Sequence, residues 1–345
     1  MALEMIKTTA MKVKLSFAII VLFATAVAFS QSGKSAMKAI VVHEYGGSEV
    51  LKYEDAPRPE PKDDEILIRV VAAAVNPVDA FIRAGRFKAG SLPFIPGMDV
   101  SGVIEKTGVK ITRFKVGEPV YAYLSFREQG GYAGFAIAKE NETSPKPKAI
   151  NHEQAAAVPL AATTAWQALI ETAKLSAGQT VLIHGGSGGV GHFAIQIAKA
   201  RGAKVIATAS TPNQDLLKQL GADQAIDYTK TKFEDIVKDV DVVLDATRSD
   251  ALAHSYGVVK KGGIVVSITG QPDQAELNKH GIRGSSVMAH PDANVLDELG
   301  KLIDAKKITP IVSQVFPLSE ASKAHQQIET RHTRGKIVLK VTEAK

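Results

Sequence analysis

A crowded run of glycines is the strongest chemical signal in this sequence. Gly185, Gly186, Gly188, Gly189 and Gly191 lie close together in the chain. Glycine lets a backbone turn tightly and approach a ligand closely, and the free N–H groups at the start of a following helix attract a pyrophosphate. The run therefore predicts a dinucleotide-binding turn. The alternative is a glycine-rich loop that makes a sharp turn and binds nothing.

The residues on both sides of the turn favour the nucleotide. Residues 180–184 are β-branched and aliphatic, as in a buried strand, and 204–209 repeat that pattern. Between them, residues 192–201 carry apolar side chains at helical spacing, namely Phe193, Ala194, Ile197 and Ala198. Strand, glycine turn, helix and strand make one βαβ unit, the context in which such a fingerprint indicates a dinucleotide site.

The end of the second strand indicates which dinucleotide binds. NAD sites usually place Asp or Glu there to bind the ribose 2′-hydroxyl. Here Ser210, Thr211 and Asn213 follow the strand, and the first carboxylate is Asp215. Small hydroxyl and amide groups leave room for a 2′-phosphate and can donate hydrogen bonds to it. The sequence therefore predicts NADPH rather than NADH.

Composition limits the possible chemistry and partners. The chain has 345 residues, enough for two domains with cores of their own. It contains no cysteine, so disulfides, cysteine-ligated zinc and a cysteine nucleophile are excluded. The net charge of +6 comes without a basic run, so no nucleic-acid partner is expected.

Residues 1–36 form a different kind of sequence. Lys12 and Lys14 precede an uncharged apolar run over 15–29, and small residues Ala28 and Ser30 follow the pattern of a signal peptidase site. This layout predicts a cleaved signal peptide, hence an exported protein with no stable membrane span after processing. The alternatives are an uncleaved anchor, or translation from Met37 and a cytoplasmic protein. In every case we expect the fold to begin at 37.

Two kinds of periodicity divide the rest of the chain. The first part has the pattern of short strands separated by turns. The strands are expected at 38–43, 51–54, 65–74, 100–107, 119–123 and 130–138. Helical spacing begins near 151, with helices expected at 154–158 and 163–173. Strands and helices then alternate: helices at 213–220, 232–237 and 251–259, and strands at 224–227, 240–245 and 263–268.

The predicted class is α/β, with a barrel-like domain followed by a doubly wound parallel sheet. We place the barrel at 37–158, the nucleotide-binding domain at 159–290 and a return to the first domain at 291–345. The return comprises a helix at 291–305, a strand at 314–317, a helix at 319–328 and a strand at 335–341.

Several longer motifs resemble one known superfamily. They are MKAIVVHEYGG (37–47), AAVNPVDAFIRAGRF (73–87), PGMDVSGVIEKTG (96–108), PLAATTAWQAL (159–169), LKQLGAD (217–223) and RGKIVL (334–339). With the glycine turn, they resemble the medium-chain dehydrogenases/reductases, and within them the zinc-independent, zeta-crystallin-like quinone oxidoreductases. The resemblance spans nearly all of 37–345 in the family's order. It implies a GroES-like β-barrel catalytic domain, a Rossmann domain, a small-molecule substrate and a homodimer.

The sequence departs from the zinc-dependent branch of that superfamily. Pro96-Gly97-Met98-Asp99 stands where the zinc branch carries a Gly-His-Glu motif, and no cysteine is available as a ligand. The histidines show no metal-ligand spacing; His152, His184, His290 and His332 are expected to be surface or hydrogen-bonded residues. Without zinc to polarise an alcohol, hydride transfer to an electron-poor quinone or α,β-unsaturated carbonyl is the expected reaction.

The resemblance also implies catalytic residues. The backbone of Asn76 should be extended because Pro77 follows it, and its amide is expected to bind the nicotinamide ribose or a substrate oxygen. The alternative is an asparagine that caps a turn. Thr163 and Thr164 are placed at the start of a helix, where each hydroxyl would cap that helix or contact the nicotinamide end. Thr164 is assigned to catalysis and Thr163 to the cofactor.

The remaining cofactor residues come from the same resemblance. The pyrophosphate is assigned to Ser187, Gly188, Gly189 and Val190. The 2′-phosphate is assigned to Ser210, Asn213 and Tyr228. Tyr228 could instead be an interface aromatic. Ala246, Ile268 and Arg334 are expected to line the cofactor, whereas Lys336 is interpreted as a surface charge and Lys218 as a solvated helix residue.

No residue is identified as a general acid. Related enoyl-thioester reductases carry a tyrosine where this chain has Phe87, and phenylalanine has no proton to donate. Phe81 and Phe87 are expected to form apolar walls for a flat substrate. Catalysis is predicted to rest on positioning, with the proton supplied by solvent or a bound water. The alternatives are an enoyl-thioester or alkenal reductase, and an NADPH-binding protein without turnover.

Overall fold

The computed structural model of the protein describes residues 36–87, 91–125 and 129–343. The predicted signal peptide lies outside the described residues, apart from Ala36 at its end. Within the described part of the chain, no helix is both long enough and apolar enough to cross a membrane.

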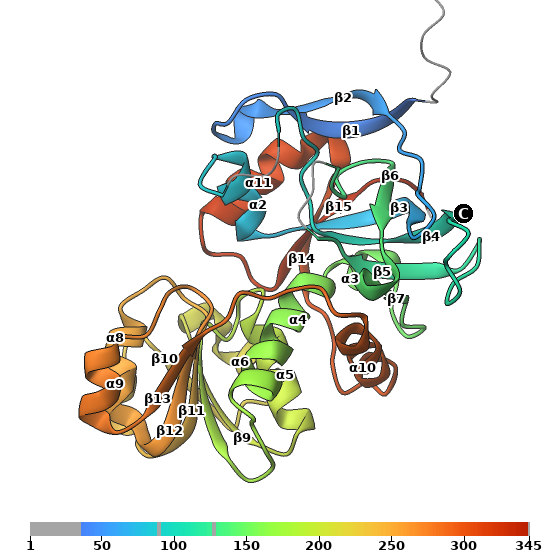
Figure 1. The fold of residues 1–345 in the computed structure, drawn as a ribbon. Coiled ribbons are helices and arrows are strands. Elements are labelled where there is room, and N and C mark those ends of the chain that lie inside the picture. Colours follow the sequence, from blue (N-terminus) through green and yellow to red (C-terminus); the bar gives the residue numbers. More distant parts are fainter. Residues whose placement is uncertain (1–35, 88–90, 126–128, 344–345) are drawn as a thin grey trace, which may run out of the picture. The chain divides into compact units, whose positions relative to one another are not determined.

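A seven-stranded sheet forms the first structural layer (Figure 1). Its strand order is β14-β15-β3-β4-β5-β7, and β6 also pairs with β3. The strands are β3 (Ile66–Val75), β4 (Asp99–Thr107), β5 (Pro119–Tyr123), β6 (Phe135–Ala138), β7 (Thr143–Pro145), β14 (Val312–Pro317) and β15 (Lys336–Lys340). Two further strands, β1 (Ala36–Val42) and β2 (Leu51–Pro57), form a small separate sheet. The C-terminal strands, red in Figure 1, thus join a sheet made mainly by the first half of the chain.

Strand β3 shows why this sheet forms. Its sequence, ILIRVVAAAV, is almost continuously apolar, and nearly every residue is buried. It pairs antiparallel with β4, β6 and β15, so both of its edges and both of its faces are covered. A continuous apolar run suits such a central strand. The strand ends at Val75, directly before Asn76.

The second large sheet has six strands, all paired in parallel, in the order β10-β9-β8-β11-β12-β13. They are β8 (Thr180–His184), β9 (Lys204–Ala209), β10 (Gln224–Asp227), β11 (Val240–Asp245), β12 (Val259–Ser267) and β13 (Arg283–Ser286). The strand order reverses between β8 and β11, and such sheets bind ligands outside the carboxyl ends of the strands at that point. The predicted fold class is confirmed.

The helices cover these sheets and connect them. The α-helices are α2 (Pro77–Arg83), α3 (His152–Ala156), α4 (Pro159–Trp166), α5 (Gly191–Ala200), α6 (Gln214–Gln219), α7 (Phe233–Ile236), α8 (Ala251–Ser255), α9 (Gln274–His280), α10 (Ala293–Asp304) and α11 (Ala321–Glu329). A π-helix, η3 (Gln167–Thr172), continues α4. Short 3-10 helices lie at Ser48–Val50, Glu140–Glu142, Thr211–Asn213, Tyr256–Val258 and Leu318–Glu320.

Several element boundaries differ from the sequence prediction. The helix expected at 163–173 begins at Pro159, because proline suits the first turn of a helix, and it becomes a π-helix from Gln167. The helix expected at 251–259 ends at Ser255. The strand expected at 130–138 is limited to Phe135–Ala138, because Gly130 and Gly131 instead donate hydrogen bonds to the loop carbonyls of Ile95 and Gly97. Helices α2 and α9 and the strands β7 and β13 were not expected.

The two largest hydrophobic clusters follow the two sheets, and a third packs residues of the parallel sheet that include Leu182 and Val243. One packs the faces of β8 and β9 against α4, α5 and α10. The other fills the interior of the seven-stranded sheet and includes Leu318, Ala321 and Ala324 near the C-terminus. Because α4 contacts β4 and β5 as well as α5, it fixes the glycine turn relative to the end of β3.

Candidate nucleotide and substrate site

The glycine turn lies directly after β8, at the carboxyl edge of the parallel sheet. Gly185 has φ +72°, a conformation that side chains rarely adopt. A Cβ atom on Gly191 would lie 2.1 Å from the carbonyl oxygen of Gly185, so no larger residue fits there. A Cβ on Gly188 would meet only the Gly185 oxygen, at 3.3 Å, so this part of the turn can be approached by a ligand.

The donors that a phosphate would need remain free at this turn. Among the described residues, the backbone N–H groups of Ser187, Gly189 and Val190 donate no hydrogen bond to another backbone group. Val190 is the N-cap of α5, and no side chain caps that helix. An uncapped helix start presents orphan donors and a partial positive charge, which together favour a bound anion. The residues therefore fit a pyrophosphate.

A C-terminal segment holds the other side of the turn. The N–H of Gly335 donates to the carbonyl of Ser187 at 2.8 Å. His192, at the start of α5, is buried; its Nδ1 lies 2.9 Å from the Gly188 oxygen, and its Nε2 accepts from Ile311 N–H at 3.3 Å. Burial lowers the pKa of His192 to about 4, so the ring is neutral with its proton on Nδ1. His192 thus ties the turn to the returning chain, a role that sequence spacing did not reveal.

The residues expected to surround a 2′-phosphate lie together. The amide Nδ2 of Asn213 donates to Ser210 Oγ at 3.1 Å, just beyond β9. Tyr228 follows β10, its N–H donates to the Ala209 carbonyl at 3.3 Å, and 58% of the residue is exposed. Lys218 is exposed on α6, as expected. The group therefore forms an accessible polar edge.

A carboxylate also lies at this edge. Asp227, the last residue of β10, is aligned with Ala209 in the sheet. It accepts hydrogen bonds from Thr211 Oγ1 at 2.6 Å and from Thr229 Oγ1 at 2.7 Å, and these contacts lower its pKa. Lys230 lies 3.7 Å away. The charge of Asp227 is thus partly compensated within the protein, which reduces its repulsion of a phosphate.

Two further loops end at the same sheet edge. Ala246 follows β11 and Ile268 follows β12, and Ile268 N–H donates to the Asp245 carbonyl at 3.1 Å. The buried carboxylate of Asp245 joins the loops, because it accepts from Thr247 Oγ1 at 2.7 Å and Thr269 Oγ1 at 3.0 Å. Ala246 and Ile268 therefore lie at the sheet edge where such folds bind a nucleotide.

The two threonines differ from their prediction. They do not start a helix: α4 begins at Pro159, and Thr163 and Thr164 lie inside it. The Thr164 hydroxyl donates to the Leu160 carbonyl at 2.7 Å, so its proton is already used. Among the described residues, the buried Oγ1 of Thr163 has no hydrogen-bond partner. Thr163 thus has the unused hydrogen-bonding capacity of this pair.

Asn76 is held on both ends of its amide. Its backbone is extended, as the following proline requires, with φ −122° and ψ 151°. Nδ2 donates to Asp99 Oδ2 at 2.9 Å, and Oδ1 accepts from Lys336 Nζ. The amide side chain does not cap α2; Asp79 contributes to that cap, because its carboxylate accepts from Asn76 N–H at 2.8 Å. Asn76 is 2% exposed, and its bond to Asp99 uses one of the two Nδ2 hydrogens.

Lys336 was wrongly interpreted as a surface charge. Its side chain is only 3% exposed, and Nζ donates to Asp99 Oδ2 at 3.3 Å as well as to Asn76. A buried ammonium group is tolerated because a buried carboxylate pairs with it. Its Cδ also lies 3.4 Å from where a Cβ on Gly189 would stand. The lysine side chain therefore links the glycine turn to Asn76.

Two buried carboxylates complete this cluster. Asp99 Oδ1 accepts from Leu160 N–H at 2.7 Å and so fixes the first turn of α4. Burial raises the pKa of Asp99, and the charge of Lys336 opposes that rise. Burial also raises the pKa of Asp79, to about 7, although hydrogen bonds from Asn76 N–H and from Tyr132 Oη lower it.

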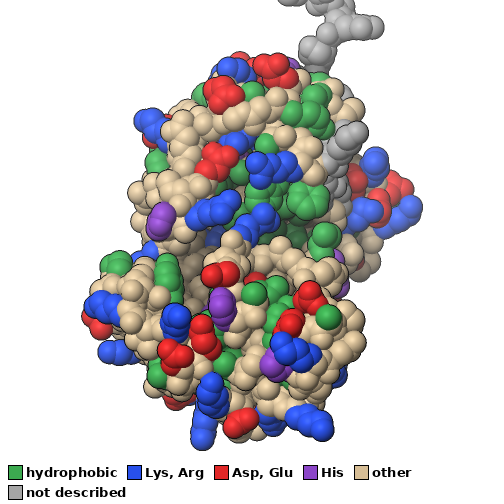
Figure 2. Space-filling model, turned by 90° about the vertical axis from the view of Figure 1, so that its left-hand side faces the viewer, with side chains coloured by type: hydrophobic (Ala, Val, Ile, Leu, Met, Phe, Trp, Pro, Cys, Tyr) green, Lys and Arg blue, Asp and Glu red, His purple; other side chains and the backbone are tan. Residues whose placement is uncertain are grey.

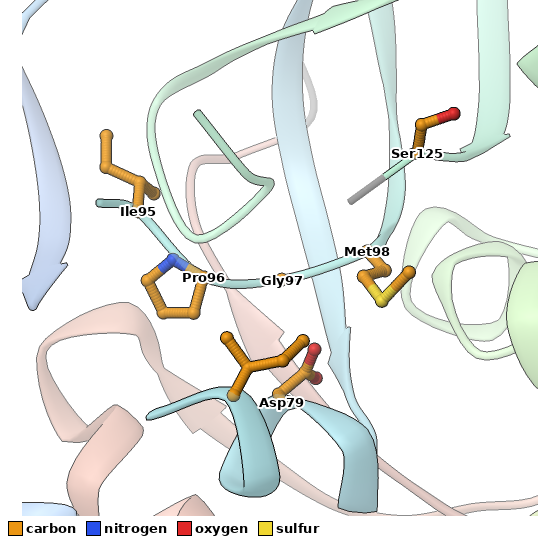
Figure 3. Close-up of a pocket in the computed structure, with 7 residues that line it drawn as sticks. Asp79, Ile95, Pro96, Gly97, Met98 and Ser125 are labelled. Atoms are coloured by element: carbon orange, nitrogen blue, oxygen red, sulfur yellow. The ribbon is translucent and has the colours of Figure 1, made fainter. Parts of the chain in front are cut away.

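Asp79 faces a small cavity (Figure 3). Its side chain points from α2 toward the segment of Gly97 and Met98. Oδ2 accepts from Tyr132 Oη at 2.9 Å, whereas Oδ1 is buried and has no partner among the described residues. The cavity has a volume of about 10 Å³, which is room for about one water molecule. Its lining residues are Asp79, Ile82, Ile95, Pro96, Gly97, Met98 and Ser125.

The two predicted wall residues also lie together. The ring centroids of Phe81 and Phe87 are 6.5 Å apart, and Phe87 is 47% exposed. Arg248, from the loop after β11, places its Cζ 4.3 Å from the centre of the Phe81 ring, and Arg86 places its Cζ 5.6 Å away. Figure 2 shows basic side chains above a hollow with hydrophobic side chains inside it. Arg334 is exposed beside Gly335, next to the glycine turn.

The donor set does not fit a zinc ion. The chain has no cysteine, and within the described ranges no three His, Asp or Glu side chains gather in a metal-binding arrangement. Asp99, in the segment that corresponds to the zinc-ligating motif, directs its oxygens at Asn76, Lys336 and Leu160.

Two family models match parts of the chain. Residues 62–148 match the alcohol dehydrogenase GroES-like domain, and residues 220–339 match a family described as zinc-binding dehydrogenase. The first match falls on the seven-stranded sheet. The second falls on strands β10 to β13 of the parallel sheet and on the returning strands β14 and β15.

Individual proteins resemble the chain over most of its length. The chloroplastic NADPH-dependent alkenal/one oxidoreductase of Arabidopsis thaliana is 42% identical over 316 residues, which cover 88% of this chain and 79% of that protein. A solved quinone oxidoreductase from Coxiella burnetii superposes with a TM-score of 0.83 at 36% identity, covering 89% and 100% of the two chains. A mycobacterial protein solved in complex with NADPH gives 0.80 at 32% identity, covering 88% and 100%.

Proposed function

We propose that this chain, which belongs to the medium-chain dehydrogenase/reductase superfamily together with quinone and alkenal/one oxidoreductases, reduces a quinone or an α,β-unsaturated carbonyl compound with NADPH. One observation carries the proposal. The Lys336 side chain runs from beside Gly189, where a phosphate-binding turn lies, to Asn76, whose amide retains a free donor. A nucleotide at the turn and an acceptor at Asn76 would therefore be adjacent.

The residues of the Rossmann domain fit NADPH. When bound, this cofactor supplies a hydride from C4 of its nicotinamide ring. We assign the pyrophosphate to the free N–H groups of Ser187, Gly189 and Val190, with Gly188 between them. The polar edge of Ser210, Asn213 and Tyr228 offers hydroxyl and amide donors to a 2′-phosphate. We assign the lining of the remainder to Ala246, Ile268, Thr163 and Arg334.

Asn76 is suited to hold the acceptor oxygen. Lys336 and Asp99 fix both ends of its amide, so the remaining N–H points in one direction before any ligand arrives. Negative charge develops on a carbonyl oxygen as hydride reaches the conjugated system. A donor that is already oriented stabilises that charge without reorganisation. The nearby Lys336 ammonium group contributes in the same sense.

The second half of the reaction needs a proton. Asn76, Phe81 and Phe87 carry no acidic proton, so water would protonate the product. Asp79 accepts a hydrogen bond from Asn76 N–H, has a pKa raised to about 7 and lines the one-water cavity. It can therefore hold a proton near neutral pH and pass it to a water molecule. Asp79 acts through that water and does not touch the acceptor.

The reaction is proposed to run without zinc, because the donor set described above does not fit that ion. A quinone or an enone is already electron-poor and needs less polarisation than an alcohol. The enoyl-thioester alternative is weaker, since Phe87 provides no proton. The alternative of a non-catalytic NADPH-binding protein predicts the same turn but no turnover.

A substrate panel tests the function. NADPH and NADH absorbance would be followed with the whole purified chain and a quinone, an enone or an enoyl thioester, each against a control without acceptor. We expect rapid NADPH loss with the quinone or the enone and slower loss with NADH. NADPH binding without oxidation by any acceptor would contradict the proposal and favour the non-catalytic alternative.

We further propose a homodimer that forms through an edge of the parallel sheet. Edge strand β13 leaves Arg283 and Gly284 exposed, so its backbone is open to pairing with a second copy. Light scattering at two concentrations would test this, and a monomer at both would contradict it.

The predicted signal peptide needs a separate test. N-terminal sequencing of the natural protein would distinguish export with cleavage from an intact Met1 or a start at Met37.

A further inference from the structure

We propose that the physiological acceptor carries an anionic group, a carboxylate or a similar oxyanion, which the guanidinium groups of Arg248 and Arg86 bind beside Phe81. This inference rests on the proposed reductase function and names its substrate class. The anionic group takes no part in the redox step: hydride adds to the β-carbon of the enone, a proton from water adds to the α-carbon, and NADP⁺ is released.

Arg248 reaches from one domain to the other. It belongs to the loop after β11, and its neighbour Thr247 is anchored by hydrogen bonds from its N–H and hydroxyl to the Asp245 carboxylate. The Cγ2 atom of Thr247 lies 3.0 Å from where a Cβ on Gly185 would stand, so this loop adjoins the glycine turn. The Arg248 side chain nevertheless ends over Phe81 on α2, at 4.3 Å.

Neither arginine has an acidic partner among the residues that the structure describes. Within the described part of the chain, neither Arg248 nor Arg86 forms an ion pair or a side-chain hydrogen bond, and both are exposed. The acid nearest to Arg248 along the chain is Asp250, whose carboxylate lies 3.7 Å from His254 on α8. By contrast, the buried Arg83 at the end of α2 pairs with Glu329. Within the described ranges, the positive charge beside Phe81 is thus left without an internal counter-charge.

The contact between Arg248 Cζ and the Phe81 ring leaves the guanidinium N–H donors available. A guanidinium group that lies over an aromatic ring uses its face, while its five N–H donors point outward in the plane of the group. Those edges match a carboxylate, which can accept two parallel hydrogen bonds. Phe81 therefore orients Arg248 for an oxyanion without consuming its hydrogen bonds.

The spacing indicates where the anion lies on the substrate. Phe81 lies five residues beyond Asn76, the N-cap of α2, which corresponds to a rise of about 7.5 Å along the helix axis. A flat acceptor could place its carbonyl oxygen at Asn76, its ring against Phe81 and Phe87, and its anionic group at the arginines. An aromatic enone or a quinone with a carboxylate on the far side of its ring fits this arrangement.

A matched pair of acceptors tests the inference. Para-carboxybenzalacetone carries the carboxylate across the ring from the enone, and its methyl ester is nearly the same size without the charge. We expect the whole enzyme to reduce the acid with the higher kcat/KM. We expect Arg248→Gln to lower kcat/KM for the acid roughly tenfold, the order of a charge-assisted hydrogen bond, and to change the ester less than about twofold. Arg86→Gln should act in the same direction but less strongly.

Arg201→Gln is the matched control. Arg201 is also exposed and stacks over an aromatic ring, with its Cζ 5.0 Å from the centre of Trp166, but at the C-terminal end of α5. It changes the net charge by the same amount and removes the same type of contact. We expect it to leave the acid-to-ester ratio unchanged. Thermal unfolding of each variant would confirm that it is folded.

The outcomes separate this inference from the function on which it rests. Equal efficiency with acid and ester, or an equal effect of Arg248→Gln on both, would overturn the inference while the reductase stands. So would reduction of a simple quinone but of neither aromatic enone. A weaker NADPH affinity in Arg248→Gln with an unchanged acid-to-ester ratio would assign Arg248 to the cofactor instead. Failure to oxidise NADPH with any acceptor would reject the proposed function itself.

Discussion

At the scale of single residues, the cluster around Asn76 shows what sequence reasoning can and cannot supply. The extended backbone of Asn76 follows from Pro77 and was predicted correctly. The burial of Lys336 was not predictable in the same way. Strand β15 reads KIVLK, with a lysine at each end, and only the tertiary structure distinguishes the buried Lys336 from the exposed Lys340. The charge partner that explains it, Asp99, lies far away in the sequence.

Lys336→Met tests whether this lysine orients Asn76. The variant leaves Asp99 as an uncompensated buried carboxylate, so we expect the free energy of unfolding to fall by about 3–5 kcal/mol. We expect kcat to fall at least roughly tenfold, because the Asn76 amide loses a partner that orients it. Lys340→Met is the control, since Lys340 pairs with Glu343 at the surface. Equal kcat in Lys336→Met and the control would contradict the assigned role.

Asp79 predicts a specific dependence of stability on pH. The pKa of Asp79 is about 7 in the folded protein, whereas the same carboxyl group has a pKa of 3.8 when it is not buried. An acid with a raised pKa is most favourable to folding below the unfolded value, and that contribution is lost as the pH rises through the folded value. Between pH 4 and 7 the loss should be on the order of a few kcal/mol. Asp79→Asn, which stays neutral, should therefore lose less stability than the wild type over this range.

Chemical unfolding at several pH values would measure that difference. Asp215→Asn provides the control, because Asp215 has a side chain that is 92% exposed. Parallel pH curves for the wild type and Asp79→Asn would show that Asp79 does not change its protonation with folding.

At the scale of elements, the turn between β8 and α5 is the part that the sequence predicted best. Its function depends on local backbone geometry, which glycines reveal directly. Helix α4 was predicted less well. Pro159 marks its first turn, a signal that the expected range of 163–173 did not use. As a result Thr163 and Thr164 were placed at a helix start, whereas both lie within α4.

Gly191→Ala tests the geometry of that turn. The added Cβ would lie 2.1 Å from the Gly185 carbonyl oxygen, so the turn must shift. We expect NADPH affinity, measured by fluorescence titration, to fall at least roughly tenfold. The reason is that the free N–H groups would no longer point together at the pyrophosphate. Gly270→Ala is the control, since a Cβ there meets nothing within 4 Å. Normal affinity in Gly191→Ala would refute the proposed pyrophosphate site.

At the scale of the whole molecule, the site depends on the C-terminal segment, which returns from the parallel sheet to the sheet of the first domain. Strands β14 and β15 join the sheet of β3, and the segment before β15 contacts the glycine turn through Gly335. The apolar residues at 335–341 predicted a strand there. No local pattern, however, indicates which distant strand it will pair with. The contact of Arg248 with Phe81 was unforeseen for the same reason. It joins a loop of the parallel sheet to a helix that the sequence did not predict.

Ligand binding should stabilise the molecule as a unit. NADPH at about a hundredfold excess over its dissociation constant should add about 2.7 kcal/mol to the free energy of unfolding. NADH at the same concentration should add less, because it cannot use the polar edge at Ser210, Asn213 and Tyr228. Thermal unfolding with each nucleotide measures both effects. A larger stabilisation by NADH would show that the edge does not select a 2′-phosphate.

The central claim is that this chain transfers hydride from NADPH to a conjugated acceptor. The most direct measurement uses NADPH deuterated on one face of C4, an enone acceptor and mass spectrometry of the saturated product. We predict that the label appears at the β-carbon of the product with one of the two deuterated forms and not with the other. An unlabelled product from both forms, or no product at all, would contradict the claim.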